Sequence, residues 1–178
     1  AADDAGHEVT LTYSLQVTDI NETPTAIALS ATAIDENAAG AVVGTLSTSD
    51  VDAGDTHTYE LSGTDAASFE VVNGELKLQD SVTANYETKN SYSVTVTATD
   101  SGSLTTTEDF TVNINNLNDA PTLVNAIADQ NVDEDSALSF TVPADAFNDE
   151  DGDTLTYTAT LSDSSDLPSW LSFDAATQ

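Results

Sequence analysis

The chain has 178 residues, and its 32 acidic residues against only two basic ones, Lys77 and Lys89, give a formal net charge of −30. This charge excludes nucleic acids and anionic membrane surfaces as favourable partners. The absence of cysteine excludes disulfides and thiolate metal sites, and no apolar run approaches the roughly 18–20 residues needed for direct membrane insertion as a helix.

Short segments of alternating apolar and polar residues predict half-buried antiparallel strands. Between them, Asn73-Gly74 predicts a tight hairpin. No long segment keeps a helical apolar period, so the sequence predicts an all-β fold of tandem immunoglobulin-like Greek-key β-sandwiches. In chain order, the predicted strands are Leu11–Val17, Tyr92–Ala98, Phe110–Ile114, Leu138–Val142 and Leu155–Leu161.

The chain repeats itself, and acidic clusters recur at fixed places in the repeat. The offset is 97 residues, from position 13 to position 110. The repeat predicts the last two strands of one unit in residues 1–20, a complete unit in 24–117 and the beginning of a third in 121–178. The recurring pairs are Tyr13–Thr25 with Phe110–Thr122, Asp35–Asn37 with Asp133–Asp135, and Asp50–Thr56 with Asp149–Thr154.

Recurrence in register favours cation binding by these carboxylates. A solvated or salt-adapted surface explains part of the charge, but it gives no reason for the acidic residues to return at the same places. Calcium takes six to eight oxygen ligands and prefers several carboxylates with some carbonyls. The sequence offers these donors and no soft ligand, so it predicts Ca²⁺ as the bound cofactor.

Five features occur in the order and approximate spacing of cadherin-type repeats. They are Asp35-Glu36-Asn37, Asp50-Val-Asp52, Asn85-Tyr-Glu87, Ala98-Thr-Asp100 and Asn116–Pro121. The middle unit resembles a bacterial cadherin-like domain of a large secreted or surface adhesin. Residues 121–178, with Phe147–Thr154 and Leu167–Asp174, resemble the dystroglycan-type cadherin-like variety.

The resemblance implies calcium between consecutive domains. It also places Asn85 and Asn116 where the family usually has aspartate, which predicts fewer or more weakly held ions at the second junction. The first junction is expected to be the poorer site, because its upstream ligands lie outside this chain. The implied first-junction ligands are Asp19, Asn21, Glu22, Asp50, Asp52 and Asp100. Those of the second junction are Glu36, Asn85, Glu87, Asn116, the Leu117 carbonyl, Asn118, Asp119, Asp149 and Asp151.

Other site types fit less well. An EF-hand loop at Asp149 would need glycine and glutamate where Thr154 and Thr160 stand. No motif for a nucleophile, a phosphate loop or a zinc protease is present, so no enzyme is predicted. Trp170 is expected in the core and His57 in solvent.

Two functions remain open. The first is a rigid spacer of an extracellular, cell-surface protein, whose partners are neighbouring repeats of the same chain. The second is a carbohydrate-binding or homophilic adhesion module that binds cell-surface glycans or another copy of the chain. The expectation that every placed aromatic faces inward favours the spacer. These aromatics are Tyr13, Tyr59, Tyr92, Phe110, Phe140 and Tyr157.

The two ends also permit two interpretations. The sequence starts without an initiator methionine or signal peptide, so an excerpt of a longer secreted chain is the favoured one. The alternative is strand addition, in which residues 10–18 of one copy complete residues 121–178 of the next.

Overall fold

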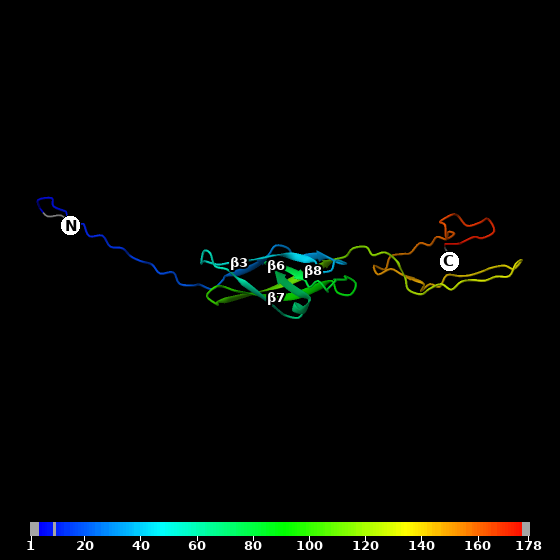
Figure 1. Cartoon of the computed structure of the whole chain (residues 1–178), viewed down its shortest axis with the longest axis horizontal. Helices are drawn as coiled ribbons and strands as arrows, with labels where there is room; N and C mark the ends of the chain where they lie inside the picture. Colours follow the sequence, from blue (N-terminus) through cyan, green and yellow to red (C-terminus); the bar gives the residue numbers. More distant parts are fainter. Residues whose placement is uncertain (1–3, 9, 176–178) are drawn as a thin grey trace.

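A computed structural model of the chain describes residues 4–8 and 10–175. Figure 1 shows a β-sandwich at the centre, from which the N-terminal and C-terminal segments leave at opposite ends. The two predicted junctions therefore lie at the two ends of the sandwich.

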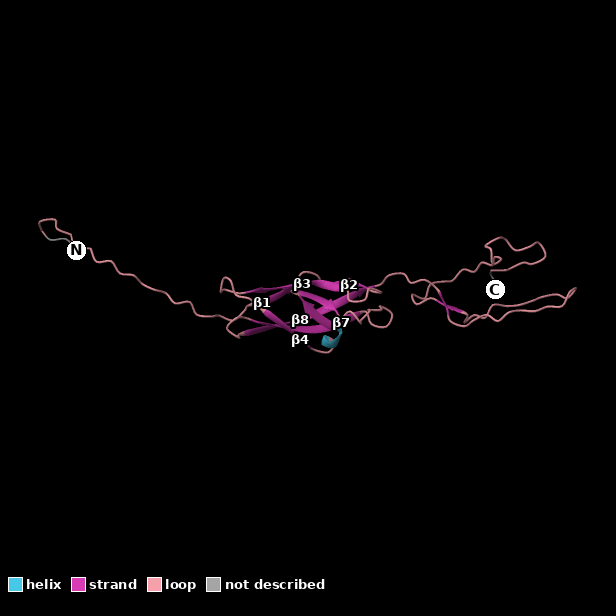
Figure 2. Cartoon of the chain, in the orientation of Figure 1, coloured by secondary structure: helices cyan, strands magenta, loops and turns pink. Residues whose placement is uncertain are grey.

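Eight strands form the sandwich in two four-stranded sheets (Figure 2). One sheet has the order β1 (Ala26–Leu29), β3 (Val42–Ser49), β6 (Glu75–Leu78) and β5 (Phe69–Val72). The other has the order β2 (Ala33–Asp35), β8 (Thr105–Asn115), β7 (Ser91–Thr99) and β4 (Thr58–Ser62). A 3-10 turn, η1 (Ala66–Ser68), precedes β5, and a separate pair, β9 (Thr122–Leu123) and β10 (Phe147–Asn148), follows the sandwich.

The core follows from the alternation in the long strands. Val94, Val96 and Ala98 point to the same face of β7 and are fully buried, while the residues between them are part-exposed. Leu76 and Leu78 of the facing sheet are also fully buried. The predicted strands Tyr92–Ala98 and Phe110–Ile114 are confirmed, and the sandwich confirms the predicted fold class.

The predicted hairpin is confirmed at Asn73-Gly74. It joins β5 to β6, with Val72 opposite Glu75. Asn73 has φ 52° and Gly74 φ 81°. Two positive φ angles define the type I′ turn, which matches the twist of the flanking strands.

Strand order brings distant acidic residues together at each end of the sandwich. At one end, β1 starts where β3 stops, with Ala26 opposite Ser49, and β4 starts where β7 stops, with Thr58 opposite Thr99. The residues that follow β3 and β7 therefore meet the linker before β1. At the other end, β2 runs parallel to β8 with Asp35 opposite Asn115, so Glu36 lies beside the linker after β8.

The expected strand at Leu11–Val17 is wrong. The segment is extended but unpaired, and its apolar side chains are mostly exposed, Tyr13 by 83%. No sheet within the described residues covers that apolar face, and a lone ribbon is marginal in water.

The expected strands Leu138–Val142 and Leu155–Leu161 are also wrong. Neither forms a ladder with any described segment, and among the described residues from 121 to 175 only Ala146 is buried. Alternation predicts a half-buried strand, but here no partner edge takes its backbone hydrogen bonds.

Because residues 121–175 form no covering sheet, several aromatic side chains there are more exposed than expected. Trp170 is 80% exposed and Phe140 40% exposed, so the expected core positions of both are wrong. The inward expectation for Tyr13 is wrong for the same reason. Tyr59, Tyr92 and Phe110 are partly buried against the sandwich core as predicted. Tyr157 is half-buried and meets Phe147 edge to face.

Candidate metal centre

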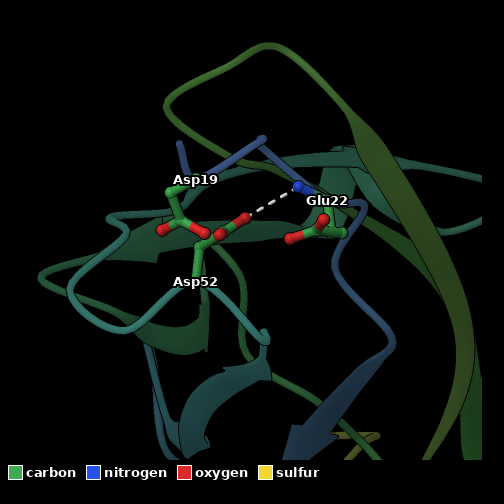
Figure 3. Close-up of side chains that lie close together, drawn as sticks. All are labelled: Asp19, Glu22 and Asp52. Carbon is green, nitrogen blue, oxygen red and sulfur yellow. Dashed lines mark hydrogen bonds between the residues drawn. The ribbon is translucent and has the colours of Figure 1, made fainter. Parts of the chain in front are cut away.

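Three acidic residues meet at the first junction, two from the linker and one from the loop after β3. Asp19, Glu22 and Asp52 each offer one carboxylate oxygen, and these oxygens lie within 4.8 Å of one another. The backbone N–H of Glu22 donates to Oδ2 of Asp52 at 2.7 Å, which holds the linker on the sandwich (Figure 3). We call Asp19, Glu22 and Asp52 the outer group.

A second set of carboxylates lies at the same end. Asp50, Asp55 and Asp100 also offer oxygens within 4.8 Å of one another, and we call them the inner group. Asp100 is 6% exposed and accepts hydrogen bonds from the Leu104 N–H at 2.7 Å and from Nδ2 of Asn21 at 3.0 Å. Asn21 therefore connects the linker to the inner group.

The inner group contains one residue that was not predicted, and a histidine lies beside the group. Asp55 joins the predicted Asp50 and Asp100, and Nε2 of His57 lies 3.1 Å from Oδ2 of Asp50. The expectation that His57 faces solvent is wrong, because 10% of its side chain is exposed. The Asp52 N–H, followed by His57, lowers the pKa of Asp50.

At the second junction, Glu36, Glu87 and Asp119 place their oxygens within 4.8 Å of one another. Glu36 is 1% exposed, and its two oxygens accept the N–H groups of Tyr86 at 2.7 Å and Leu117 at 2.8 Å. A buried carboxylate thus joins the end of β2, the loop before β7 and the linker. We call Glu36, Glu87 and Asp119 the junction group.

The linker contact of the first junction recurs at the second. The N–H of Asp119 donates to Oδ2 of Asp151 at 2.6 Å, as Glu22 does to Asp52 one repeat earlier. Nδ2 of Asn85 adds a contact to Glu150 at 2.8 Å. The loop after β10 is therefore attached both to the linker and to the sandwich.

The other predicted ligands lie outside the three groups. Oδ1 of Asp149 accepts an N–H of its own loop, from Asp153 at 3.2 Å. Asn118 donates to the Asp119 carbonyl, Asn116 is exposed, and Leu117 takes part through its N–H. The expectation of a poorer first junction stays a prediction. Among the residues that the structure describes, two carboxylate groups lie at the first junction and one lies at the second.

Crowding of negative charge changes the proton affinity of these groups. Desolvation, together with the charges of Glu36, Asp151 and Asp119, raises the pKa of Glu87. Desolvation and the charges of Glu36, Asp151 and Glu150 raise the pKa of Asp119. Desolvation and Asp52 raise the pKa of Glu22. Each ionised carboxylate is thus disfavoured by its neighbours, and a cation would remove that penalty.

The donors fit a calcium ion. All are oxygens, mostly carboxylate, as calcium prefers. Two buried carboxylate oxygens, Oδ2 of Asp55 and Oδ2 of Asp119, accept no hydrogen bond from the described residues. Buried polar atoms are otherwise almost always paired, so each of these oxygens is available to a cation.

Gly102 makes room for the linker. A Cβ built there would lie 2.4 Å from the Asn21 side chain. We expect Gly102→Ala to displace Asn21 from Asp100 and weaken cation binding at the first junction, while the domain loses only the roughly 0.5–1.5 kcal/mol of one hydrogen bond. Calcium titration and thermal melting measure the two effects. Gly74→Ala, where the added Cβ meets no atom within 4 Å but the φ of +81° strains the hairpin, lies outside the three groups and should leave calcium affinity unchanged. Equal affinities of all three proteins would contradict this role of Gly102.

Two families match the chain. Residues 30–115 match the cadherin domain family, and residues 120–178 match the family described as "Putative Ig domain". The two matches lie largely within the predicted units 24–117 and 121–178, and the division into these units stays a prediction.

Solved structures of cadherin extracellular domains are similar to the chain. Two crystal forms of human protocadherin-24 EC1-2 are 27% and 28% identical, cover 54% and 57% of this chain, and have TM-scores of 0.45 and 0.48. Extracellular cadherin domains 1–5 of protocadherin gamma B2 are 26% identical over 76% of this chain, with a TM-score of 0.45. The chain spans 44%, 49% and 27% of those three structures. No curated protein matches the chain significantly. Within the described residues, no helix is long and apolar enough to span a membrane.

Proposed function

Because residues 30–115 form a cadherin domain, an extracellular adhesion module, we propose that this chain is a calcium-binding structural stretch of a large extracellular protein. Calcium at both junctions holds successive β domains in a stiff rod that supports cell adhesion. The observation that carries the proposal is the same at both ends: linker and domain carboxylates gather within 4.8 Å, and each end has a buried oxygen without a donor.

The second junction illustrates how a cation would stiffen the rod. Glu36 and Glu87 belong to the sandwich, Asp119 to the linker, and Asp151 to the unit that follows. Without a cation, these like charges repel one another, by about 1 kcal/mol per pair at 4 Å in water and more where water is excluded. Shared ligation replaces that repulsion with attraction to one ion, and the two units then lose their freedom to hinge.

Several predicted ligands would have to reorient to join the ion. Asn85, Asn116, Asn118, the Leu117 carbonyl and Asp149 are proposed as secondary ligands at the second junction. Calcium accepts flexible geometry and as many as eight oxygens, so the junction group leaves positions for them.

The test compares two glutamates. We expect Glu87→Ala to weaken calcium binding at the second junction by about tenfold or more. Loss of a residue that only hydrogen-bonds to a metal ligand already costs about that much, and loss of a ligand should cost at least as much. Glu75→Ala removes the same charge at the start of β6, away from both junctions, and should leave the affinity unchanged. Calorimetric titration of calcium measures both variants. Equal affinities would show that Glu87 is not a ligand, and no binding heat in the unsubstituted chain would reject the function.

The alternative is a carbohydrate-binding or homophilic adhesion module. The exposed Trp170 ring favours it, since sugar recognition uses aromatic stacking surfaces. Against it, the aromatics placed within the sandwich pack partly into the core and leave no aromatic face. Calcium-independent retention on immobilised glycans would favour the alternative, whereas calcium-dependent stiffening without retention would favour the spacer.

A further inference from the structure

The hairpin turn between β5 and β6 carries the one Asn-Gly pair in the sequence, Asn73-Gly74. Asn73 is exposed, and its φ of 52° together with the φ of 81° at Gly74 places both residues in the left-handed region. Gly74 has no side chain, and a Cβ built there would meet no atom within 4 Å. The two residues are therefore open to solvent, with nothing packed over the glycine.

Neither polar group between the two residues is held in place. Within the part of the chain that the structure describes, the side-chain amide of Asn73 has no hydrogen-bond partner and the Gly74 N–H donates to none. The Gly74 carbonyl, by contrast, accepts the Leu46 N–H at 2.8 Å, which attaches the turn to β3. The Asn73 amide can therefore rotate toward the main-chain nitrogen that follows it.

Asn85 shows the opposite arrangement. Its Oδ1 accepts the Thr88 N–H at 2.8 Å, and its Nδ2 donates to Glu150 at 2.8 Å. The nitrogen that follows it, in Tyr86, donates to the buried Glu36 at 2.7 Å. Because both the side-chain amide and the next main-chain nitrogen are engaged, Asn85 is protected from the reaction that the hairpin permits.

We propose that Asn73 is a site of spontaneous deamidation, which converts the turn into a mixture of aspartate and isoaspartate. The Gly74 nitrogen loses its proton to water and attacks Cγ of Asn73, so that a new C–N bond forms, the bond from Cγ to the amide nitrogen breaks, and ammonia leaves. The product is a cyclic succinimide. Water opens this ring at either carbonyl: breaking the new bond gives aspartate, and breaking the original peptide bond gives isoaspartate, in which the chain continues through Cγ. The reaction consumes one water, releases one ammonia and needs no oxidant.

The isoaspartate product does not fit the turn. It adds a methylene group to the backbone of a hairpin whose register depends on its loop length, and it moves the Gly74 carbonyl away from the Leu46 N–H. The strand before the turn, β5, is an edge strand that carries the buried Phe69 against the Tyr92 ring. Deamidation therefore loosens one edge of the sandwich. It does so outside the three carboxylate groups, so it does not depend on the proposed calcium-binding function.

Incubation of the full chain in warm, mildly alkaline buffer, followed by peptide mapping with mass spectrometry, measures the reaction. We expect the mass gain of replacing NH2 by OH at Asn73, isoaspartate at the same position when the chain is labelled by an isoaspartate methyltransferase, and no change at Asn85. Asn73→Gln should lose the signal, because its longer side chain closes a ring more slowly. The isoaspartate fraction should melt at a temperature lower by roughly 4–8 °C, the effect of losing about one hydrogen bond in a domain of this size.

Two further samples make the result decisive. A synthetic peptide of residues 71–76 shows how fast the same pair reacts without the fold. Asn73→Asp adds the charge but keeps the backbone, and because Asp-Gly also favours the type I′ turn, this variant when freshly prepared should melt like the unsubstituted chain. If Asn73 stays intact in the folded chain while the peptide reacts to completion, the fold protects the site and the proposal is wrong. Equal conversion of Asn73 and Asn85 would overturn it as well, because the reaction would then not follow the geometry of the turn.

Discussion

Glu36→Ala should destabilise the sandwich by about 2–4 kcal/mol even when calcium is absent. The substitution leaves the N–H groups of Tyr86 and Leu117 without acceptors, and each unsatisfied donor costs roughly 1–3 kcal/mol when buried. The same change removes one negative charge from the junction group. That relief is worth about 1 kcal/mol in water for each of the neighbours Glu87 and Asp119, against roughly 2–6 kcal/mol for the two lost hydrogen bonds, so the net effect is destabilising.

Urea denaturation in the presence of chelator measures this effect directly. Asp35→Ala is the matched control: it removes a charge one residue earlier, from an exposed side chain that accepts only from Nδ2 of Asn115 among the hydrogen bonds described, at 2.9 Å. Its cost should be within the 0–1 kcal/mol typical of surface groups. An unchanged urea midpoint for Glu36→Ala, or equal midpoints for the two variants, would mean that the Glu36 carboxylate does not hold the linker.

The local sequence pattern was sufficient to predict a strand where that strand pairs with another strand of the chain. Val94, Val96 and Ala98 alternate in sequence and are buried in β7, and Asn73-Gly74 forms the turn that its residue types favour. The same alternation at Leu11–Val17 and Leu155–Leu161 gave no strand. Alternation with a period of two shows which side chains would share one face of a strand. A β-ladder also needs a neighbouring strand edge with free N–H and carbonyl groups, and sequence periodicity carries no information about that edge.

It was easier to predict which acidic residues lie close together than which side chains contact one another. Asp19, Glu22 and Asp52, which the resemblance implies at one junction, lie together because strand order fixes where each loop lies. Their role as ligands stays a prediction. Asp55 was missed although it recurs as Asp153, because an acid after a glycine reads as a turn residue until the backbone shows where it points. Glu150 was missed as well, and its contact with Asn85 depends on how the two units meet.

Removing calcium is expected to produce the largest change in the whole molecule. Free calcium at 100 times its dissociation constant stabilises a folded domain by about 2.7 kcal/mol per site. For a domain of 60–100 residues, each kcal/mol shifts the melting temperature by roughly 4–8 °C, so chelation should lower it by roughly 10–20 °C. Differential scanning calorimetry with and without chelator measures the shift. Magnesium is the matched control ion, because it demands tight octahedral geometry and keeps its waters, and it should restore little of the lost stability.

Chelation should also change the shape of the chain in solution, which a purely stabilising ion would not do. With the cation gone, the hydrogen bonds described across the second junction include those from Asp119 to Asp151 and from Asn85 to Glu150, together with two between linker and sandwich, from Asn37 to Asp119 and from Leu117 to Glu36. The bonds to Asp151 and Glu150 attach the following unit to the linker and to the sandwich, where the carboxylates then repel one another without a cation between them. The angle between the units should therefore become variable. Small-angle scattering should then show a broader distribution of intramolecular distances, and adding salt should narrow it by screening the repulsion. A profile identical with calcium and with chelator, alongside an unchanged melting temperature, would show that calcium does not hold the units of this chain in line.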